Sequence, residues 1–167
     1  MVESRLSLAD QRVFEPRGTF VPDIQKIFGV DYKRVVSGML EDFGLLPEGH
    51  VLNFFETPIE HSGSRARYFL EELVGPNKIY VSFLDSKSVT TRHKHQPPIV
   101  ESYFQLAGSS FLRIDNDFRE LKKGSVLSVL SDISHQLTTR EDPSLVLIVM
   151  RNASLVSADR LHIPVTL

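Results

Sequence analysis

The sequence predicts a mainly β fold, a sandwich or barrel that follows a partly helical N-terminal extension. Short β-rich runs, separated by turn residues every ~8–12 residues, fill the second half of the chain and favour such a fold. A length of 167 residues fits about one domain, and 41% hydrophobic with 24% charged residues is typical of globular proteins. We place the extension at residues 1–75 and the barrel at residues 76–167.

Two short helices are predicted in the extension. Pro22 suits a first helical turn and Gly29 suits a helix end, so that they bracket the segment PDIQKIF. Asp31 can cap a second helix, which Gly44 would end. Apolar residues at helical spacing predict one packing face on this second helix, formed by Val35, Val36, Met39, Leu40 and Phe43.

The predicted strands follow in order along the chain. HVLNFFE, residues 50–56, is short, aromatic and bounded by turn residues. RYFLEELV and KIYVSFL flank Gly75-Pro76-Asn77 and predict a hairpin, although RARYFLEEL could also form a helical turn or two. Further strands are expected at SVTTRHKH, IVESYFQLAG, SSFLRID, FRELKKG, SVLSVLS, HQLTTR and SLVLIVM.

Composition and charge narrow the function classes. A formal net charge of -2 provides no basic field for phosphate backbones, which disfavours nucleic-acid binding. Without cysteine, disulfides, thiolate nucleophiles and cysteine-ligated metals are excluded, so a metal would need histidine and carboxylate ligands. The first residues lack the apolar core of a signal peptide, and no run approaches the ~20 apolar residues of a membrane span. We therefore expect a cytoplasmic protein without a membrane partner.

A group of histidines and one carboxylate could bind a metal ion. His93 and His95 are spaced i, i+2, which places both imidazoles on one face of a strand. Pro97-Pro98 predicts a turn that brings Glu101 back on the adjacent strand, and His135 begins a later predicted strand. Three imidazoles and one carboxylate suit a borderline divalent ion such as iron, manganese, nickel, zinc or cobalt.

These residues lie in two segments that resemble the motifs of the cupin superfamily. KSVTTRHKHQPPIVESYFQLAG resembles the first motif, G-x5-H-x-H-x(3,4)-E-x6-G, with matches at His93, His95, Glu101 and Gly108. GSVLSVLSDISHQLTT is similar to the second motif, G-x5-P-x-G-x2-H-x3-N, with matches at Gly124 and His135. The resemblance spans residues 79–150. It implies a short jelly-roll barrel that encloses a divalent transition metal, Fe, Mn, Ni or Zn, held by His93, His95, Glu101 and His135.

The chain departs from the cupin pattern at several positions. Five residues separate His95 from Glu101 where three or four are usual, and a two-proline insertion of this kind can be absorbed at a strand turn. The spacing from Glu101 to Gly108 keeps the register of the following strand. Asp132 can adopt the left-handed conformation that glycine usually supplies. Three further positions depart from the pattern, namely Lys87, Leu130 and Thr139 in place of glycine, proline and asparagine.

Residues beside the ligands are candidates for a substrate pocket. Alternation from Glu101 places Tyr103 and Gln105 on the same face, and alternation from His135 places Leu137 and Thr139 there. These four either line the pocket or belong to the core. The Tyr103 hydroxyl needs a partner if it is buried, so Tyr103 and Glu101 are the candidate catalytic residues. The remaining histidines have no such partners and are interpreted as structural or exposed: His50, His61 and His162.

The resemblance implies several activities, namely those of dioxygenases, oxalate-type decarboxylases and sugar-phosphate isomerases. We favour an oxidoreductase of the mononuclear metal dioxygenase type that acts on a small, partly apolar substrate. The reasons are eleven phenylalanines and no basic cluster on the predicted inward faces to hold phosphate. One alternative is a metal-dependent sugar or sugar-phosphate isomerase in which Glu101 or Tyr103 shuttles a proton. The other is a non-catalytic small-ligand binding or sensor barrel. Because cupins are often dimers, we also expect a homodimer.

Overall fold

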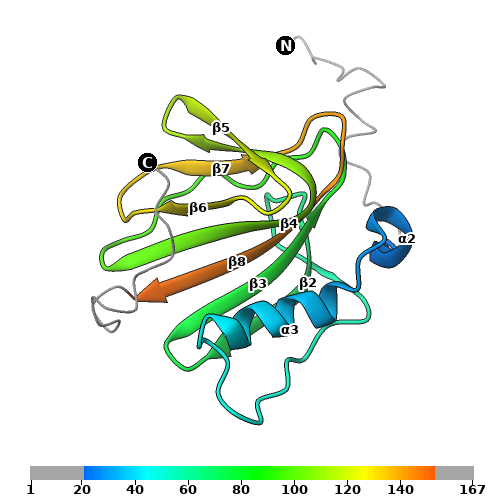
Figure 1. Cartoon of the computed structure of the whole chain (residues 1–167). Coiled ribbons are helices and arrows are strands. Elements are labelled where there is room, and N and C mark those ends of the chain that lie inside the picture. The colour runs from blue at the N-terminus through cyan, green and yellow to red at the C-terminus, as the bar shows by residue number, and fades with distance from the viewer. Residues whose placement is uncertain (1–20, 153–167) are drawn as a thin grey trace, which may run out of the picture.

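Antiparallel strands make up most of the regular secondary structure of the molecule, which is described here by a computed structural model covering residues 21–152. The main sheet runs in the order β1-β2-β3-β8-β4-β5, and β6 and β7 also pair with β4 (Figure 1). The strands are β1 (Ile59–Glu60), β2 (Arg67–Val74), β3 (Asn77–Leu84), β4 (Ile99–Ile114), β5 (Asp117–Lys122), β6 (Val126–Val129), β7 (His135–Thr138) and β8 (Ser144–Asn152). The predicted mainly β fold is confirmed.

The long strand β4 connects two layers of the barrel. Its first half pairs with β6 and β8, whereas its second half pairs with β5 and β7. Between the halves the register shifts from Gln105 to Ala107, and Gly108 has a positive φ of 67°. A Cβ atom at Gly108 would overlap the backbone carbonyl of Pro143. The two strands predicted for residues 99–115 therefore form one bent strand, and the bend requires glycine.

The predicted hairpin at residues 67–84 is confirmed. β2 and β3 pair from Arg67 and Phe83 down to Val74 and Asn77, and Gly75 in the turn has a φ of 58°. The alternative of a helical turn in this segment is therefore wrong. β2 joins the sheet as the neighbour of β3, while the boundary that we placed between residues 75 and 76 stays a prediction.

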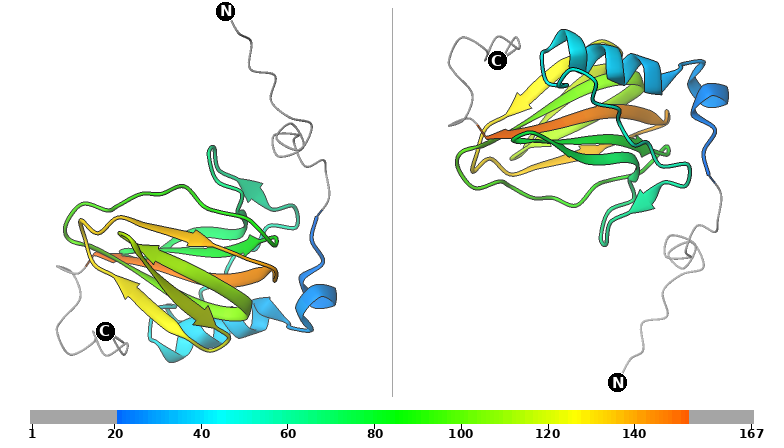
Figure 2. Two further views of the ribbon diagram at one scale, coloured as in Figure 1. Left: turned by 90° about the horizontal axis from the view of Figure 1, so that it is seen from above. Right: turned by 90° about the horizontal axis from the view of Figure 1, so that it is seen from below.

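Two helices precede the sheet, as predicted. They are α2 (Ile24–Phe28), with Asp23 as its N-cap, and α3 (Tyr32–Asp42), with Asp31 as its N-cap. Each cap carboxylate accepts a hydrogen bond from a backbone N–H of the first turn. α2 ends at the left-handed Gly29. Figure 2 shows α3 lying along the outside of the sheet.

The packing face of α3 is narrower than its apolar pattern predicts. Val36 and Leu40 are fully buried against the sheet. Val35 and Phe43, at the edges of the stripe, are 38% and 42% exposed. Phe43 nevertheless touches Phe104 of the sheet, with ring centroids 5.2 Å apart. A flat sheet can cover only the central rows of a helix, so the outer positions remain partly in solvent.

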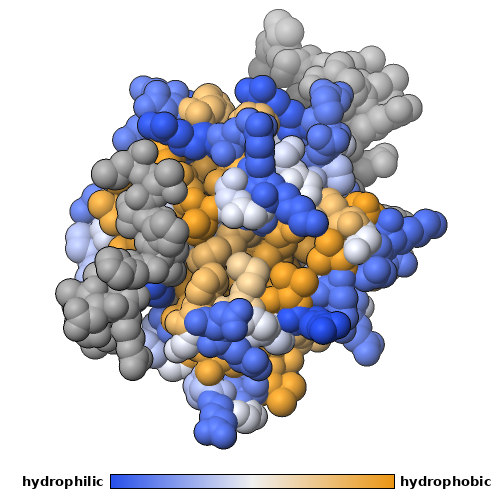
Figure 3. Space-filling model, viewed as in Figure 1, coloured by the Kyte–Doolittle hydropathy of each residue, from blue (hydrophilic) through white to orange (hydrophobic). Residues whose placement is uncertain are grey.

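Two apolar clusters lie on opposite sides of the sheet. The outer cluster fills the space between α3 and the sheet, and apolar residues gather over β8 and β4 on this face (Figure 3). The inner cluster fills the barrel around Tyr103, Leu112, Leu137 and Ile148. Consecutive residues of β8, such as Leu147 and Ile148, therefore belong to different clusters, because successive side chains of a strand point to opposite faces.

Two segments predicted as strands are not regular strands. Residues 50–56 form no strand, although the Phe55 N–H donates to the Phe69 carbonyl and the Asn53 N–H donates to the Glu72 carboxylate. Residues 88–95 form isolated bridges, in which Val89 pairs with Thr138 and His93 pairs with His135. Side chains in this polar segment satisfy part of the backbone, since Thr90 Oγ1 accepts from the Leu137 N–H. Within residues 21–152, no helix is long and apolar enough to cross a membrane.

Candidate metal centre

Four side chains meet inside one end of the barrel. His93 and His95 come from the extended segment before β4, Glu101 from β4, and His135 is the first residue of β7. One ligand atom from each residue lies within 4.8 Å of all the others. The Oε2 atom of Glu101 is 2.7 Å from Nε2 of His95, 2.7 Å from Nε2 of His135 and 3.6 Å from Nε2 of His93. The structure thus brings together all four of the ligands predicted from the sequence.

Backbone pairing brings the first two histidines to the third. The N–H of His93 donates to the carbonyl of His135, and the N–H of His135 donates to the carbonyl of His93, at 3.0 and 2.8 Å. Further from the metal ligands, the Thr90 N–H donates to the Leu137 carbonyl and continues this pairing between the two segments. This short ladder fixes His93 next to His135 although residues 88–95 form no regular strand.

The longer spacer between His95 and Glu101 forms a turn and leaves both ligands in place. The turn closes through a hydrogen bond from the Ile99 N–H to the Gln96 carbonyl. The His95 carbonyl accepts from the N–H of Asp132, which has the predicted left-handed conformation with a φ of 64°. The two added residues are thus taken up before β4 begins, so Glu101 keeps its position on the strand.

Hydrogen bonds to the backbone orient two of the imidazoles. Nδ1 of His93 lies 2.9 Å from the Thr91 carbonyl oxygen, and Nδ1 of His135 lies 2.8 Å from the Ile133 carbonyl oxygen. A carbonyl only accepts, so both Nδ1 atoms carry hydrogen, and a neutral ring presents its Nε2 lone pair to Glu101. Histidine ligands of metals are commonly held in this way.

The contacts around Glu101 need a cation. An Nε2 lone pair and a carboxylate oxygen 2.7 Å apart repel each other unless a proton or a metal ion lies between them. Protonation of all three imidazoles would collect three positive charges around one buried carboxylate, which burial makes costly. A single divalent ion would satisfy the same lone pairs. His93, His95, Glu101 and His135 therefore fit a borderline divalent metal.

The electrostatics of the cluster also favour positive charge. Burial by itself raises the pKa of Glu101, but hydrogen bonds with His135, His93 and His95 outweigh it and hold that pKa well below its usual range. The hydrogen bond with Glu101 in turn raises the pKa of His93. Glu101, only 4% exposed, is therefore a buried negative charge at the centre of the cluster.

Three of the four ligands, His93, His95 and Glu101, line a cavity of about 280 Å³. This volume is near the lower end of the range for small-molecule sites, about 300 Å³. Tyr103 and Leu137 line this cavity, as the sequence predicts for pocket residues. Ile148 and Met150 of β8 add apolar surface beside them. Tyr103 is fully buried next to Glu101. Burial raises the pKa of the Tyr103 hydroxyl well above its usual range, and the negative charge of Glu101 adds to this effect, so the phenol keeps its proton.

The other two predicted pocket residues lie elsewhere. The Gln105 amide donates to Ser144 Oγ and to the Ala107 carbonyl across the register shift of β4, where it stabilises the bend. Thr139 Oγ1 accepts from the Ser88 N–H and donates to the Asp85 carbonyl, so it anchors the segment after β3. Gln105 keeps the register of Glu101 and Tyr103, because β4 shifts only after it, but it lies farther along the strand from Glu101. Thr139 follows the end of β7 at Thr138.

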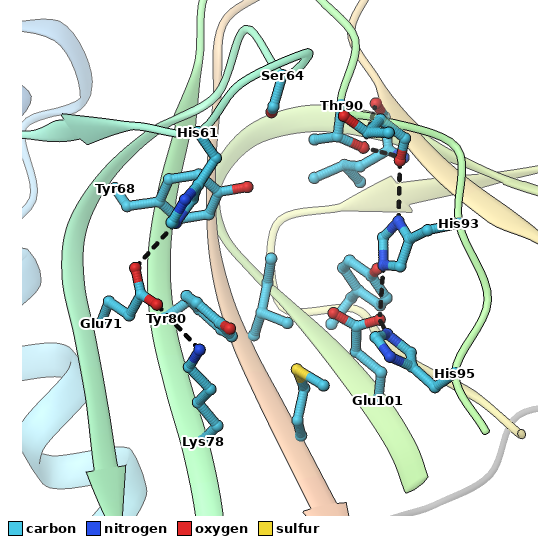
Figure 4. Close-up of a pocket in the computed structure, with 15 residues that line it drawn as sticks. His61, Ser64, Tyr68, Glu71, Lys78, Tyr80, Thr90, His93, His95 and Glu101 are labelled. Carbon is cyan, nitrogen blue, oxygen red and sulfur yellow. Dashed lines mark hydrogen bonds and ion pairs between the residues drawn. The ribbon is translucent and has the colours of Figure 1, made fainter. Parts of the chain in front are cut away.

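The wall opposite the ligands was not predicted from the sequence. It consists of Tyr68 and Glu71 of β2 with Lys78 and Tyr80 of β3, and we call it the hairpin wall (Figure 4). His61, which we interpreted as structural or exposed, also lines the cavity, with its Nε2 2.8 Å from Glu71 Oε2. The i, i+2 spacing of Lys78 and Tyr80 on the confirmed hairpin was the available signal. Of the other unassigned histidines, His50 pairs with Glu72, and His162 lies outside the described residues.

A register shift in β2 builds this wall. Tyr68 and Glu71 are three residues apart, so in a regular strand they would point to opposite faces. β2 shifts its register between Tyr68 and Leu70, and Phe69 and Leu70 both enter the outer apolar cluster. Tyr68 and Glu71 therefore both face the cavity.

Comparisons with known proteins agree with this architecture. No protein-family model and no curated protein sequence matches the chain. Solved structures do match. A Cupin 2 conserved barrel domain protein from Salinispora arenicola CNS-205 has a TM-score of 0.53 and 14% identity over 64% of this chain and 92% of its own. A predicted oxalate decarboxylase from Thermotoga maritima has a TM-score of 0.54 and 21% identity over 62% of this chain and 99% of its own. This structural similarity shows that the chain has the cupin barrel fold, which the motifs in its sequence also predict.

Proposed function

We propose that the chain is a metal-dependent enzyme that converts a small molecule inside the barrel. One observation carries the proposal: the Nε2 atoms of His93, His95 and His135 meet the carboxylate of Glu101 at the wall of a cavity large enough for a small substrate. A purely structural metal site is normally closed by protein ligands, whereas a catalytic site stays open to a substrate.

The metal would supply Lewis-acid polarisation of a substrate oxygen and, for iron, chemistry with O₂. The chain's own residues bind and orient the substrate. Tyr103, whose raised pKa keeps its proton, hydrogen-bonds to Glu101 and orients that carboxylate at the cavity. Leu137, Ile148 and Met150 exclude water from the middle of the cavity and favour an apolar part of the substrate.

Among metal-dependent reactions we favour that of a mononuclear metal dioxygenase. The apolar side chains that border the ligands support this choice, since they suit a partly apolar substrate. The test is oxygen consumption by the iron-loaded protein with a panel of small diols and diketones. Uptake of O₂ that is present in the wild type and in His50→Ala but lost in His93→Ala is expected. If no panel member causes oxygen uptake while iron is fully loaded, the dioxygenase assignment is wrong.

The alternative is a metal-dependent sugar or sugar-phosphate isomerase. Lys78 and the tyrosine hydroxyls of the hairpin wall favour this alternative, because they can hydrogen-bond to the hydroxyl and phosphate groups of a sugar phosphate. Anaerobic incubation of the metal-loaded protein with aldoses, ketoses and their phosphates would distinguish the two, since an isomerase needs no oxygen. Binding without turnover in both assays would favour the non-catalytic binding or sensor barrel.

A further inference from the structure

The hairpin wall is rich in hydrogen-bond donors. Tyr68, Lys78 and Tyr80 line the cavity on the side opposite His93 and His95, and Figure 4 shows the hydroxyls of Tyr68 and Tyr80 pointing across it. Phenols and ammonium groups donate hydrogen bonds, and an ammonium group cannot accept them. Such a wall is suited to an acceptor of negative charge.

The phenols are poised to donate. Burial raises the pKa of Tyr68 and also that of Tyr80, so both hydroxyls are protonated at neutral pH. The Ser64 hydroxyl hydrogen-bonds to Tyr68 and lowers the Tyr68 pKa against that trend. A serine hydroxyl can donate as well as accept, so Tyr68 can give its proton to a ligand.

Lys78 is fixed at the same wall. Its Nζ lies 2.9 Å from Glu71 Oε1 and 5.0 Å from the centroid of the Tyr80 ring. Hydrogen bonds with Tyr80 and with Glu71 raise the pKa of Lys78, so it remains an ammonium. An ammonium has three hydrogens, and these two partners leave one of them for a ligand. Glu71 itself is engaged by both Lys78 and His61, so its negative charge is balanced within the wall.

We propose that Tyr68, Lys78 and Tyr80 bind the carboxylate of a small organic acid whose other end reaches the metal ligands. The inference rests on the proposed metal-dependent function and names its substrate class. Ile148 and Met150 of β8 lie between β3 and β4 and accommodate a short apolar middle. A single negative charge is favoured over a phosphate dianion, because Lys78 is already paired with Glu71 and leaves the wall little surplus positive charge.

Ligands with one metal-binding end and one variable end test this arrangement. The probes are the monohydroxamates of succinic, glutaric and adipic acid, each compared with the primary amide of the same shape and no charge. Calorimetry on the Co²⁺-loaded protein gives the affinity, and the Co²⁺ absorption spectrum reports separately whether the hydroxamate reaches the metal. At the optimal length, the acid is expected to bind at least about tenfold more tightly than its amide, as charge-assisted hydrogen bonds would provide.

Variants of the wall decide which residues are responsible. Lys78→Met keeps the aliphatic stem over Tyr80, and Tyr68→Phe and Tyr80→Phe keep their rings. Each is expected to reduce the preference for acid over amide by about threefold to tenfold while the Co²⁺ spectrum still changes. Lys122→Met, at the exposed end of β5 where Lys122 pairs with Glu120, is the matched control and should leave the preference unchanged.

The outcomes separate the wall from the metal centre. If acid and amide bind equally while the Co²⁺ spectrum changes, or if a phosphonate-ended probe binds more tightly than the acid, the carboxylate site is wrong and the metal centre stands. If no hydroxamate alters the spectrum, the metal centre fails. In that case the hairpin wall is tested by itself: the metal-free protein is titrated with butanoate while the NMR signals of the tyrosine rings are recorded. Shifts that are lost in Lys78→Met would support it, and the absence of shifts would overturn it.

Discussion

Glu101 and His135 lie 34 residues apart in the sequence, yet the carboxylate Oε2 of one is 2.7 Å from the imidazole Nε2 of the other. His135 pairs in register with Ile114 at the far end of β4, whereas Glu101 lies near the start of that strand. The contact therefore crosses the interior of the barrel between the two halves of β4. It depends on the bend in that strand and on the bridge between His93 and His135.

The first prediction concerns metal content. The double substitution His93→Ala/His135→Ala removes two of the three imidazoles, so stoichiometric metal found in the wild type by elemental analysis should be lost. His50→Ala is the control, because His50 pairs with Glu72 away from the cluster, and it should retain the metal. Equal metal content in the wild type and the double variant would contradict the assigned ligands.

The second prediction links the metal to stability. An ion that binds only the folded chain stabilises it by about 2.7 kcal/mol when present at about 100 times its dissociation constant. Addition of Mn²⁺ or Ni²⁺ to metal-free protein should therefore raise the Tm, and a chelator should reverse the rise. The same increase in His93→Ala would show that the metal acts at another place.

The third prediction concerns Glu71 and pH. Burial raises the pKa of Glu71, but Lys78 and His61 outweigh it and lower that pKa below the ordinary value of 4.5. A carboxyl group whose pKa is lower in the folded than in the unfolded state stabilises the protein above its unfolded pKa. This contribution disappears as the pH falls through the folded value.

Glu71→Gln should accordingly lower the free energy of unfolding at pH 7, and its difference from the wild type should shrink below pH 4.5. Urea unfolding at several pH values measures this difference. Glu48→Gln, at an exposed position, is the control and should show little difference at any pH. A Glu71→Gln difference that persists unchanged at low pH would mean that the carboxylate charge is not the cause.

The fourth prediction concerns the bend in β4. Gly108→Ala must place a methyl group against the Pro143 carbonyl in addition to adopting a positive φ. Gly44 has nearly the same φ, 66°, with nothing within 4 Å of an added Cβ. Gly44→Ala should therefore cost about 1–2 kcal/mol of conformational strain, and Gly108→Ala clearly more. Equal losses in thermal unfolding would show that the close approach to Pro143 is not restrictive.

The expected homodimer stays a prediction. Val36 and Leu40 of α3 are buried against the sheet of the same chain, so the helical extension has a packing partner without a second copy. Light scattering of the full chain should give twice the mass of one chain. A monomer at all concentrations tested would contradict the expectation.

The sequence by itself determined the elements that depend on local signals. Asp31 and the helical spacing of Val36 and Leu40 predicted α3, and Gly75-Pro76-Asn77 between two apolar runs predicted the hairpin of β2 and β3. The four candidate ligands were predicted because their spacing resembles the cupin motifs. Gly108, part of the same motif, occupies a backbone position where a side chain would collide with the Pro143 carbonyl.

Only the tertiary structure decided which other residues face the cavity. Register shifts in β2 and β4 change the face to which later residues point, and alternation read along the sequence does not detect them. The shift in β2 is the reason that the hairpin wall was missed. Gln105 does alternate with Glu101, but its amide is engaged by Ala107 and Ser144 at the bend of β4. Lys78 and Glu101 face the same cavity because β8 lies between β3 and β4, with Met150 paired to both residues, and these pairings join strands that are distant in sequence.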